Sequence, residues 1–151
     1  MIKLIATNRK AHRDYAVFET FECGIELKGA EVKSARDGKV NLNDSFARIE
    51  NNGVILYNTH ISPYSQASYL DLEPARPRRL LLHKNQIRKL TGRLTQKGFT
   101  LVPLKAYFNE RGFLKLELVL CKGKKLYDKR EDIKRRETEL EMRRVMKSKR
   151  R

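Results

Sequence analysis

Residues 99–121, FTLVPLKAYFNERGFLKLELVLC, contain the pattern on which the fold depends. Two apolar segments, 99–108 and 113–121, flank the turn-forming sequence Asn-Glu-Arg-Gly at 109–112, and this pattern predicts an antiparallel hairpin. The two faces of the second segment carry Lys115, Glu117 and Val119 on one side and Phe113, Leu114, Leu116, Leu118 and Leu120 on the other. We therefore expect this hairpin to pack its apolar face into a core.

Further strands are predicted upstream of this hairpin. Residues 15–27, YAVFETFECGIEL, mix aromatic, β-branched and polar residues with partial alternation, which favours one long strand. Gly24 interrupts it, and such a glycine commonly marks a bulge or a bend at a barrel corner. Residues 45–50 and 54–61 flank the Asn-Asn-Gly sequence at 51–53, which predicts a second hairpin.

Helices are predicted between these strands. Residues 31–36 favour a short helix that ends near Gly38, a residue free to adopt positive φ. Residues 84–97 have three apolar residues at helical spacing, whereas residues 62–77 contain three prolines and predict a long loop. Antiparallel strands with inserted helices predict a mainly β domain over residues 1–121, a small OB-like β-barrel.

The charge of the chain indicates its kind of partner. The 151 residues include 34 Lys and Arg against 18 Asp and Glu, a formal net charge of +16. So large a charge repels itself in the compact state, and a polyanionic partner is the natural explanation. The alternative is a soluble basic protein from an unusual host. We favour nucleic acid, because so strong and uneven a charge is typical of phosphate binding.

The sequence argues against a membrane or a metal as the partner. The longest apolar runs, such as 80–82 and 118–121, are far too short to span a bilayer, and residues 1–6 lack the apolar stretch of a signal peptide. Cys23 and Cys121 show no metal-ligand spacing, and we expect free, half-buried thiols in a reducing cytosol. These features predict a cytoplasmic protein without a membrane contact, metal or cofactor.

The composition changes abruptly at Lys122. Residues 122–151 contain 14 basic and 6 acidic residues, so half of the net charge, +8, lies on a fifth of the chain. Leu126, Ile133 and Leu140 form an apolar stripe that is too narrow to bury a helix against the barrel. We expect a basic C-terminal tail that is disordered when free and becomes helical on an anionic surface. The alternative is a solvated extension without function.

Catalytic patterns are missing from the sequence. His12, His60 and His83 lie in different predicted elements, and no HExxH, GxSxG, CxxC or phosphate-loop pattern occurs. The sequence therefore favours an RNA-binding protein that is not an enzyme. An RNA-processing enzyme is the alternative from another class, and it would require a cluster of acid, base or metal-ligating residues.

Six segments of the chain resemble the bacterial SmpB family. They are 8–15 (NRKAHRDY), 29–34 (GAEVKS), 38–45 (GKVNLNDS), 78–83 (RRLLLH), 101–104 (LVPL) and 123–130 (GKKLYDKR). The segments occur in the family's order and, together with the basic tail, are highly specific. The resemblance implies an OB-like barrel that binds the tRNA-like domain of tmRNA.

The resemblance also implies a place in translation. A member of this family delivers tmRNA, with elongation factor Tu acting indirectly through the tmRNA, to ribosomes stalled on messages without a stop codon. In this process, trans-translation, the tail is implied to reach the decoding centre and the empty mRNA channel. The runner-up function is a general OB-type binder of ribosomal or structured RNA.

The resemblance to the family, together with the charges, implies two sets of site residues. The tmRNA-binding set is Asn8, Arg9, Lys10, Arg13, Glu22, Lys33, Lys39, Leu81 and Lys124. The ribosome-binding set is Lys125, Tyr127, Asp128, Lys129, Arg130, Val145, Met146 and Lys147. We expect the cations to neutralise phosphates as a group and Tyr127 to stack on an unpaired base.

Three members of the tmRNA-binding set have more specific expectations. Asn8 can donate and accept hydrogen bonds toward base edges. Glu22 can accept from a base amine or a ribose 2′-OH, and the alternative is a cross-strand ion pair with a lysine or arginine. For Leu81 the alternative is a place in the core, from which it would support the binding face.

Overall fold

The computed structural model describes residues 2–63, 73–124 and 137–147. Within these ranges the strands are β1 (Lys3–Thr7), β2 (Tyr15–Ile25), β3 (Val40–Asn41), β4 (Phe46–Glu50), β5 (Gly53–Tyr57), β6 (His60–Ile61), β7 (Arg78–Leu81), β8 (Thr100–Phe108) and β9 (Leu114–Gly123). The helices are α1 (Arg9–Asp14), α2 (Gly29–Arg36) and α3 (Lys84–Leu94), and residues 137–147 are helical as well. The protein is mainly β with inserted helices, as its sequence predicts.

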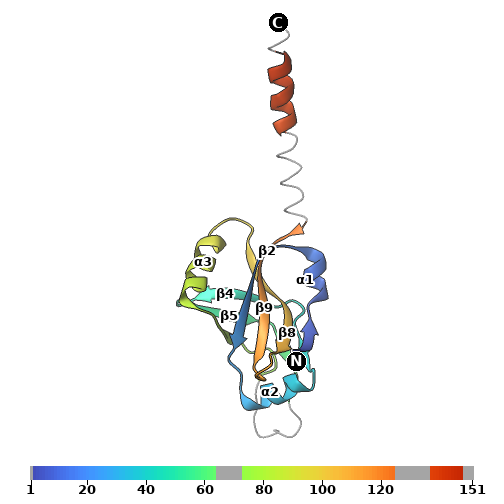
Figure 1. Ribbon diagram of the computed structural model, residues 1–151, viewed down its shortest axis with the longest axis vertical. Helices are drawn as coiled ribbons and strands as arrows, with labels where there is room; N and C mark the ends of the chain where they lie inside the picture. Colours follow the sequence, from blue (N-terminus) through green and yellow to red (C-terminus); the bar gives the residue numbers. More distant parts are fainter. Residues whose placement is uncertain (1, 64–72, 125–136, 148–151) are drawn as a thin grey trace.

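The strands close into a small barrel (Figure 1). Their hydrogen-bonded order is β8-β4-β5-β7-β2-β9, and β9 pairs again with β8, so the sheet closes on itself. β1 pairs with one edge of β8, and β3 pairs with β6 in a separate two-stranded sheet. All of these pairings are antiparallel. This arrangement confirms the predicted antiparallel barrel.

Strand β2 contains a bulge, but not at the predicted glycine. Its pairing with β9 shifts by one residue after Val17, which leaves Phe18 as the extra residue of the bulge. Gly24 instead pairs regularly with Leu81 of β7 and with Lys115 of β9. A Cβ atom at Gly24 would lie 3.4 Å from the Cβ atom of Leu81. This distance is an ordinary van der Waals contact, so Gly24 is neither at a bulge nor required by a close approach of β7.

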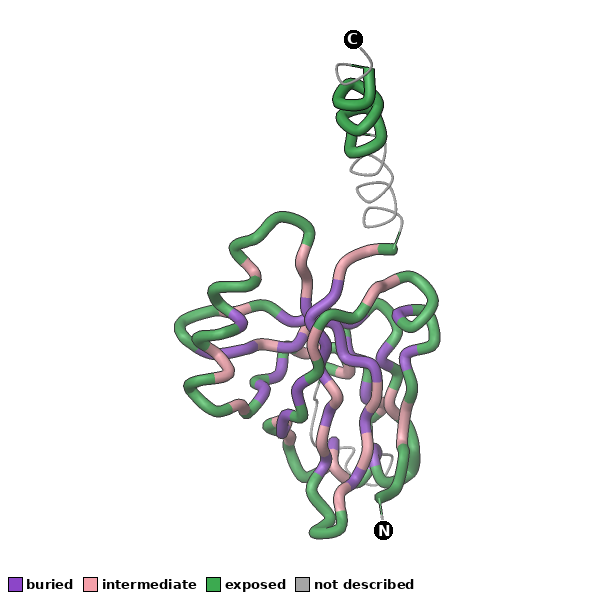
Figure 2. Tube along the Cα trace, turned by 45° about the horizontal axis from the view of Figure 1, so that its top comes forward, coloured by how far each residue is buried: buried purple, intermediate pink, exposed green. Residues whose placement is uncertain are grey.

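Two apolar clusters stabilise the barrel. Figure 2 shows in purple the buried residues along its strands. The larger cluster fills the interior of the barrel and includes, from β9, the buried side chains of Leu114, Leu116, Leu118 and Leu120. The smaller joins α1 to the outer face of β8 and β9 through Ala11, Val102, Leu104, Val119 and Cys121. Val119 is buried on the face predicted to be polar because α1, which the sequence did not predict, covers it. Phe113, assigned to the apolar face, is 62% exposed because it precedes β9 at the turn.

Local residues set the turns and helix ends. Asn51 and Asn52 adopt φ values of 49° and 62°, as a type I′ turn between β4 and β5 requires. Gly38 follows α2 with a φ of 75°, which confirms its predicted role. Helix α3 ends at Leu94, before the predicted end at Lys97.

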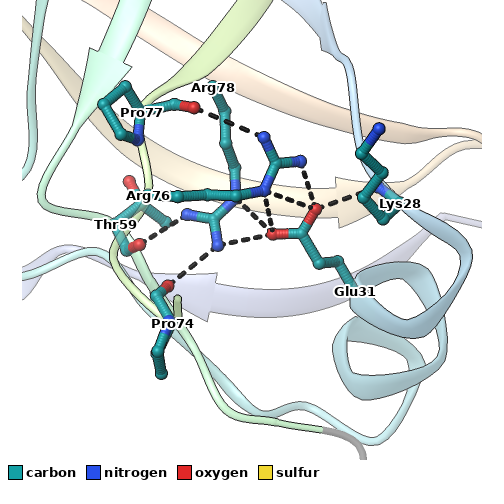
Figure 3. Close-up of polar contacts among 7 residues, drawn as sticks. All are labelled: Lys28, Glu31, Thr59, Pro74, Arg76, Pro77 and Arg78. Atoms are coloured by element: carbon teal, nitrogen blue, oxygen red, sulfur yellow. Dashed lines mark hydrogen bonds and ion pairs between the residues drawn. The ribbon is translucent and has the colours of Figure 1, made fainter. Parts of the chain in front are cut away.

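A buried ion network joins α2 to β7 (Figure 3). Glu31 is 5% exposed and Arg78 only 1%. The Glu31 carboxylate accepts hydrogen bonds from Arg78 Nε at 2.7 Å, from the Arg76 guanidinium and from the Lys28 backbone N–H at 2.9 Å. Arg78 also donates to the carbonyl oxygens of Thr59, at 2.6 Å, and Pro74, at 2.8 Å. The network therefore links segments that are far apart in the sequence.

The Glu31 carboxyl makes the stability of this fold depend on pH. Burial raises its pKa, but the hydrogen bonds from Arg76, the Lys28 backbone and Arg78 outweigh burial and hold the pKa below its ordinary value of 4.5. A carboxyl of this kind stabilises the fold above its unfolded-state pKa and loses that effect as the pH falls through its folded-state pKa. We expect the difference in unfolding free energy between wild type and Glu31→Gln to narrow below about pH 4.5. Urea unfolding at neutral and acidic pH measures this difference, and a constant difference would contradict the prediction.

Candidate RNA-binding surface

The outer face of β2, β9 and β8 continues from α1 down the barrel. Val119 of β9 points outward and lies beneath α1, and the next outward residues of the same strand are Glu117 and Lys115. The neighbouring strands place Glu22 opposite Glu117 and Tyr107 opposite Lys115. The candidate surface therefore has an upper part formed by α1 and a lower part that contains Glu22 and Tyr107.

Asn8 fixes α1 on the barrel. It is the N-cap of the helix, because its Oδ1 accepts a hydrogen bond from the Ala11 backbone N–H at 3.1 Å. Its Nδ2 donates to the carbonyl oxygens of Leu42 and Pro103, each at 3.0 Å, and the residue is only 2% exposed. Both hydrogens of this amide are already donated inside the protein, so the structure shows Asn8 positioning α1. Its contact with a base edge stays a prediction.

Basic side chains from two distant segments meet at α1. Arg9, Lys10 and Arg13 are exposed on the helix. Lys124 lies beside them, since its Nζ donates to the His12 carbonyl oxygen at 3.2 Å. Lys10, Arg13 and Lys124 line a groove of about 580 Å³. An RNA backbone in this groove would meet cations from α1 and from the end of β9.

Two of these cations have carboxylate partners at the surface. Lys10 Nζ lies 2.7 Å from Asp44 Oδ1, and Arg13 Nε lies 3.2 Å from Asp14 Oδ1. The hydrogen bond that Lys10 donates to the Asp44 carboxylate, together with the negative charge of that carboxylate, raises the pKa of Lys10, which stays protonated. Exposed pairs of this kind contribute little to stability. A phosphate can therefore replace the carboxylates without a large loss of stability.

Glu22 has a partner that the sequence did not indicate. The Tyr107 hydroxyl of β8 donates a hydrogen bond to the Glu22 carboxylate across β9. Burial and this hydrogen bond raise the pKa of Tyr107, so the hydroxyl keeps its proton. The residue opposite Glu22 is Glu117. The structure thus shows a hydrogen bond to a tyrosine in place of the alternative cross-strand ion pair.

Leu81 belongs to the same outer face. It is 54% exposed, whereas Leu80 beside it is 2% exposed and packs in the core. The alternative that Leu81 lies in the core is therefore wrong, since strand β7 points alternate side chains in opposite directions. Leu81 pairs with Gly24, two residues beyond Glu22 on β2.

Lys33 and Lys39 lie elsewhere on the barrel. Lys33 is exposed on α2, and Lys39 is exposed just after that helix. Figure 1 shows α2 at the end of the barrel opposite the point where the chain leaves β9. The structure therefore brings together only the predicted cations of α1 and Lys124.

The ribosome-binding set lies partly outside the described residues. Five of its members lie outside the described residues: Lys125, Tyr127, Asp128, Lys129 and Arg130. Val145, Met146 and Lys147 lie on the helix of residues 137–147, in which every residue is exposed. Strand β9 continues to Gly123, beyond the predicted boundary at Cys121. The disorder of the tail in the free protein stays a prediction.

The cysteines have no visible chemical role. Cys23 and Cys121 are free and fully buried rather than half-buried, and burial raises the pKa of each thiol to about 12. In the described ranges, no group of three or more His, Cys, Asp or Glu residues is placed to hold a metal ion. None of the helices in those ranges is long and apolar enough to cross a membrane.

Two residues of the site, Tyr107 and Asp44, were not predicted from the sequence, and they orient Glu22 and Lys10. A signal for Tyr107 existed, because it alternates with Lys105 in a predicted strand. However, Glu22, the partner of Tyr107, lies two strands away in the sheet, and the alternation of residues along one strand does not predict the order of the strands. For Asp44 there was no comparable local signal, since it meets Lys10 only after the barrel closes.

Comparison with known proteins gives the family. The family model described as SmpB protein matches residues 5–148. The SsrA-binding protein of Caldanaerobacter subterraneus subsp. tengcongensis is 58% identical over 148 residues, which cover 98% of this chain and 93% of that protein. The SsrA-binding protein of Caldicellulosiruptor bescii is 60% identical over 146 residues, which cover 97% and 92%.

A solved structure agrees with these matches. It is described as "tmRNA-SmpB: a journey to the center of the bacterial ribosome", and its chain is 52% identical to this one. The superposition has a TM-score of 0.68 and covers 81% of this chain and 85% of that chain. Because the family model and the relatives extend over nearly the whole length, this chain belongs to the SmpB family.

Proposed function

We propose that this protein binds the tRNA-like domain of tmRNA and delivers it to stalled ribosomes for trans-translation. Its relatives are SsrA-binding proteins, SsrA RNA being tmRNA, and a solved relative belongs to a study of tmRNA and SmpB in the ribosome. In this proposal the protein acts in the cytoplasm and catalyses no reaction. Elongation factor Tu is reached indirectly through the tmRNA.

The observation that carries this proposal is the convergence of cations over α1. Lys10, Arg13 and Lys124 line one groove, and Asn8 holds the helix that carries the first two. Phosphate contacts of this kind supply affinity, while neighbouring polar groups such as Glu22 supply selectivity. Lys33 and Lys39 would then contact a more distant part of the RNA.

The barrel and the tail have separate tasks in this proposal. The barrel of residues 1–121, together with Lys124 beside α1, binds the tmRNA. The basic tail of residues 122–151 enters the decoding centre and the empty mRNA channel with the part that follows Lys124, and it orders there. Its exposed apolar residues Val145 and Met146 would be contacts within that channel.

Arg13→Gln tests the proposal at the groove. We expect affinity for the tRNA-like domain to fall about 3- to 10-fold and the slope of log affinity against log salt to fall by roughly 0.9, because one phosphate contact is lost. Filter binding at several salt concentrations measures both quantities. Arg111→Gln, an exposed site on the turn between β8 and β9, is the control. Equal losses in the two variants would contradict a site at α1.

Tyr107→Phe tests the lower part of the surface. Without the hydroxyl, the Glu22 carboxylate is no longer held in place, and it must be ordered when RNA binds. We expect affinity for the tRNA-like domain to fall roughly 3- to 10-fold, while the unfolding free energy changes by about 1 kcal/mol or less. Unchanged affinity in the same binding assay would remove Glu22 from the site.

A further inference from the structure

The paired ends of β2 and β9, where the chain leaves the barrel, have two faces. Cys121 points to the face covered by α1. Successive residues of a strand point in opposite directions, so Lys122 points away from α1. On that second face Lys122 meets Phe18 of β2 and Phe99. We call Phe18, Phe99 and Lys122 the aromatic cluster, and none of its members belongs to the surface described above.

The aromatic cluster has the geometry of a stacking platform. The ring centroids of Phe18 and Phe99 lie 5.1 Å apart with an interplanar angle of 82°, an edge-to-face contact. Lys122 Nζ lies 4.3 Å from the centroid of the Phe99 ring and 5.6 Å from that of Phe18. Phe18 is 45% exposed. A ring is therefore presented at the surface with a cation fixed beside it.

The bulge in β2 lies at Phe18, which is exposed on the face that points away from α1. A bulge inserts one extra residue and redirects its side chain, and bulges are frequent next to functional sites. Phe18 is that extra residue. Without the bulge, the alternation of β2 would place the following residues on the wrong faces of the barrel. The irregular part of β2 therefore carries an exposed aromatic ring.

The surroundings of the aromatic cluster favour a nucleotide as its ligand. Lys89 of α3 forms an ion pair with Glu19, the residue after Phe18, and Arg88 and Arg93 are exposed on the same helix. Among the ion pairs formed within the described ranges, none involves Lys122. Unpaired bases stack on aromatic rings, and lysines beside the rings neutralise the phosphates.

We propose that the aromatic cluster stacks one unpaired base of small-subunit ribosomal RNA, with Lys122 at the adjoining phosphate. This inference rests on the proposed function, in which the face of α1 is occupied by tmRNA. The aromatic cluster lies on the opposite face of the same paired strands, next to the start of the tail. A surface that faces away from tmRNA and adjoins the ribosome-bound tail is placed to contact the ribosome.

Phe18→Leu in the full chain tests this proposal, because leucine keeps an apolar side chain and removes the ring. We expect binding to purified small ribosomal subunits to weaken roughly 5- to 100-fold, as for a lost base–aromatic stack, and binding to the tRNA-like domain to stay unchanged. Phe18→Tyr keeps the ring and should bind both like wild type. Phe113→Leu is the matched control, since Phe113 is also exposed. Lys122→Gln should lower the salt slope of subunit binding by roughly 0.7.

The outcomes separate this proposal from the proposed function. Equal subunit binding by Phe18→Leu and wild type would overturn the stacking site and leave tmRNA binding intact. A loss confined to the tRNA-like domain would also overturn it, because the ring would then contact tmRNA. Failure of the wild-type protein to bind the tRNA-like domain would instead overturn the proposed function. If thermal unfolding shows that Phe18→Leu does not fold, the Phe18→Tyr affinity and the Lys122→Gln salt slope decide the question.

Discussion

Glu31→Ala is expected to lower the free energy of unfolding by about 3–5 kcal/mol, because it leaves a buried arginine without its counter-charge. Arg78 is 1% exposed and would keep only its contacts with the Thr59 and Pro74 carbonyl oxygens. Domains of this kind are stable by about 5–15 kcal/mol, so the loss would be a large share of the total. Urea denaturation followed by circular dichroism measures it.

Asp44→Asn is the control for this experiment. This change breaks the ion pair between Lys10 and Asp44, whose side chains are 52% and 70% exposed, respectively. We expect the free energy of unfolding to change by less than about 1 kcal/mol. Glu31→Gln should lie between the two variants, since the amide oxygen still accepts a hydrogen bond. If Glu31→Ala is no more destabilising than Asp44→Asn, the buried network does not hold α2 against β7.

Asn8→Ala is expected to reduce both stability and RNA binding. The change removes the N-cap of α1 and leaves the buried carbonyl oxygens of Leu42 and Pro103 without their donors, for a combined loss of about 3 kcal/mol. With α1 displaced, Lys10 and Arg13 no longer meet Lys124, so we expect affinity for the tRNA-like domain to fall at least about tenfold. Thermal unfolding and filter binding measure the two effects.

Two further variants separate positioning from direct contact at Asn8. Asn8→Asp keeps an oxygen for the N-cap but loses both donated hydrogen bonds, so it should lose stability as well. Asn85→Ala, at an exposed position on α3, is the matched control and should change neither quantity. A variant Asn8→Ala that loses RNA binding at wild-type stability would show that Asn8 contacts RNA directly, as its sequence context first suggested.

The parts of the fold that the sequence predicts are those with a local signal. The hairpin of β8 and β9 follows from alternation and a turn sequence, and the Asn51-Asn52 turn follows from residues that tolerate positive φ. Helix α1 was missed because it is short and buries only Ala11 against the barrel, so it shows little periodicity. The bulge at Phe18 was not predicted, because it depends on the register with β9, whereas Gly24, where a bulge or a bend was expected, is a signal visible in the sequence.

The candidate site was predictable in composition but not in geometry. Charge and motif order indicated Lys10, Arg13 and Lys124 as cations, yet only the closed barrel brings them to one groove and leaves Lys33 outside it. The role of Asn8 was equally hard to predict, because the sequence does not distinguish a buried asparagine that caps a helix from an exposed one that contacts a base. Such distinctions depend on contacts between residues that lie far apart in the chain.

Competitive binding tests the central claim, that the barrel binds the tRNA-like domain of tmRNA, most directly. Full-length protein and a truncation after Lys124, which preserves all of β9, would be titrated against that domain in the presence of bulk tRNA or an unrelated hairpin RNA. We predict that the tRNA-like domain competes clearly best and that truncation leaves its binding largely intact. Equal binding of all three RNAs, abolished by truncation, would instead make the chain a general basic RNA binder and contradict the account.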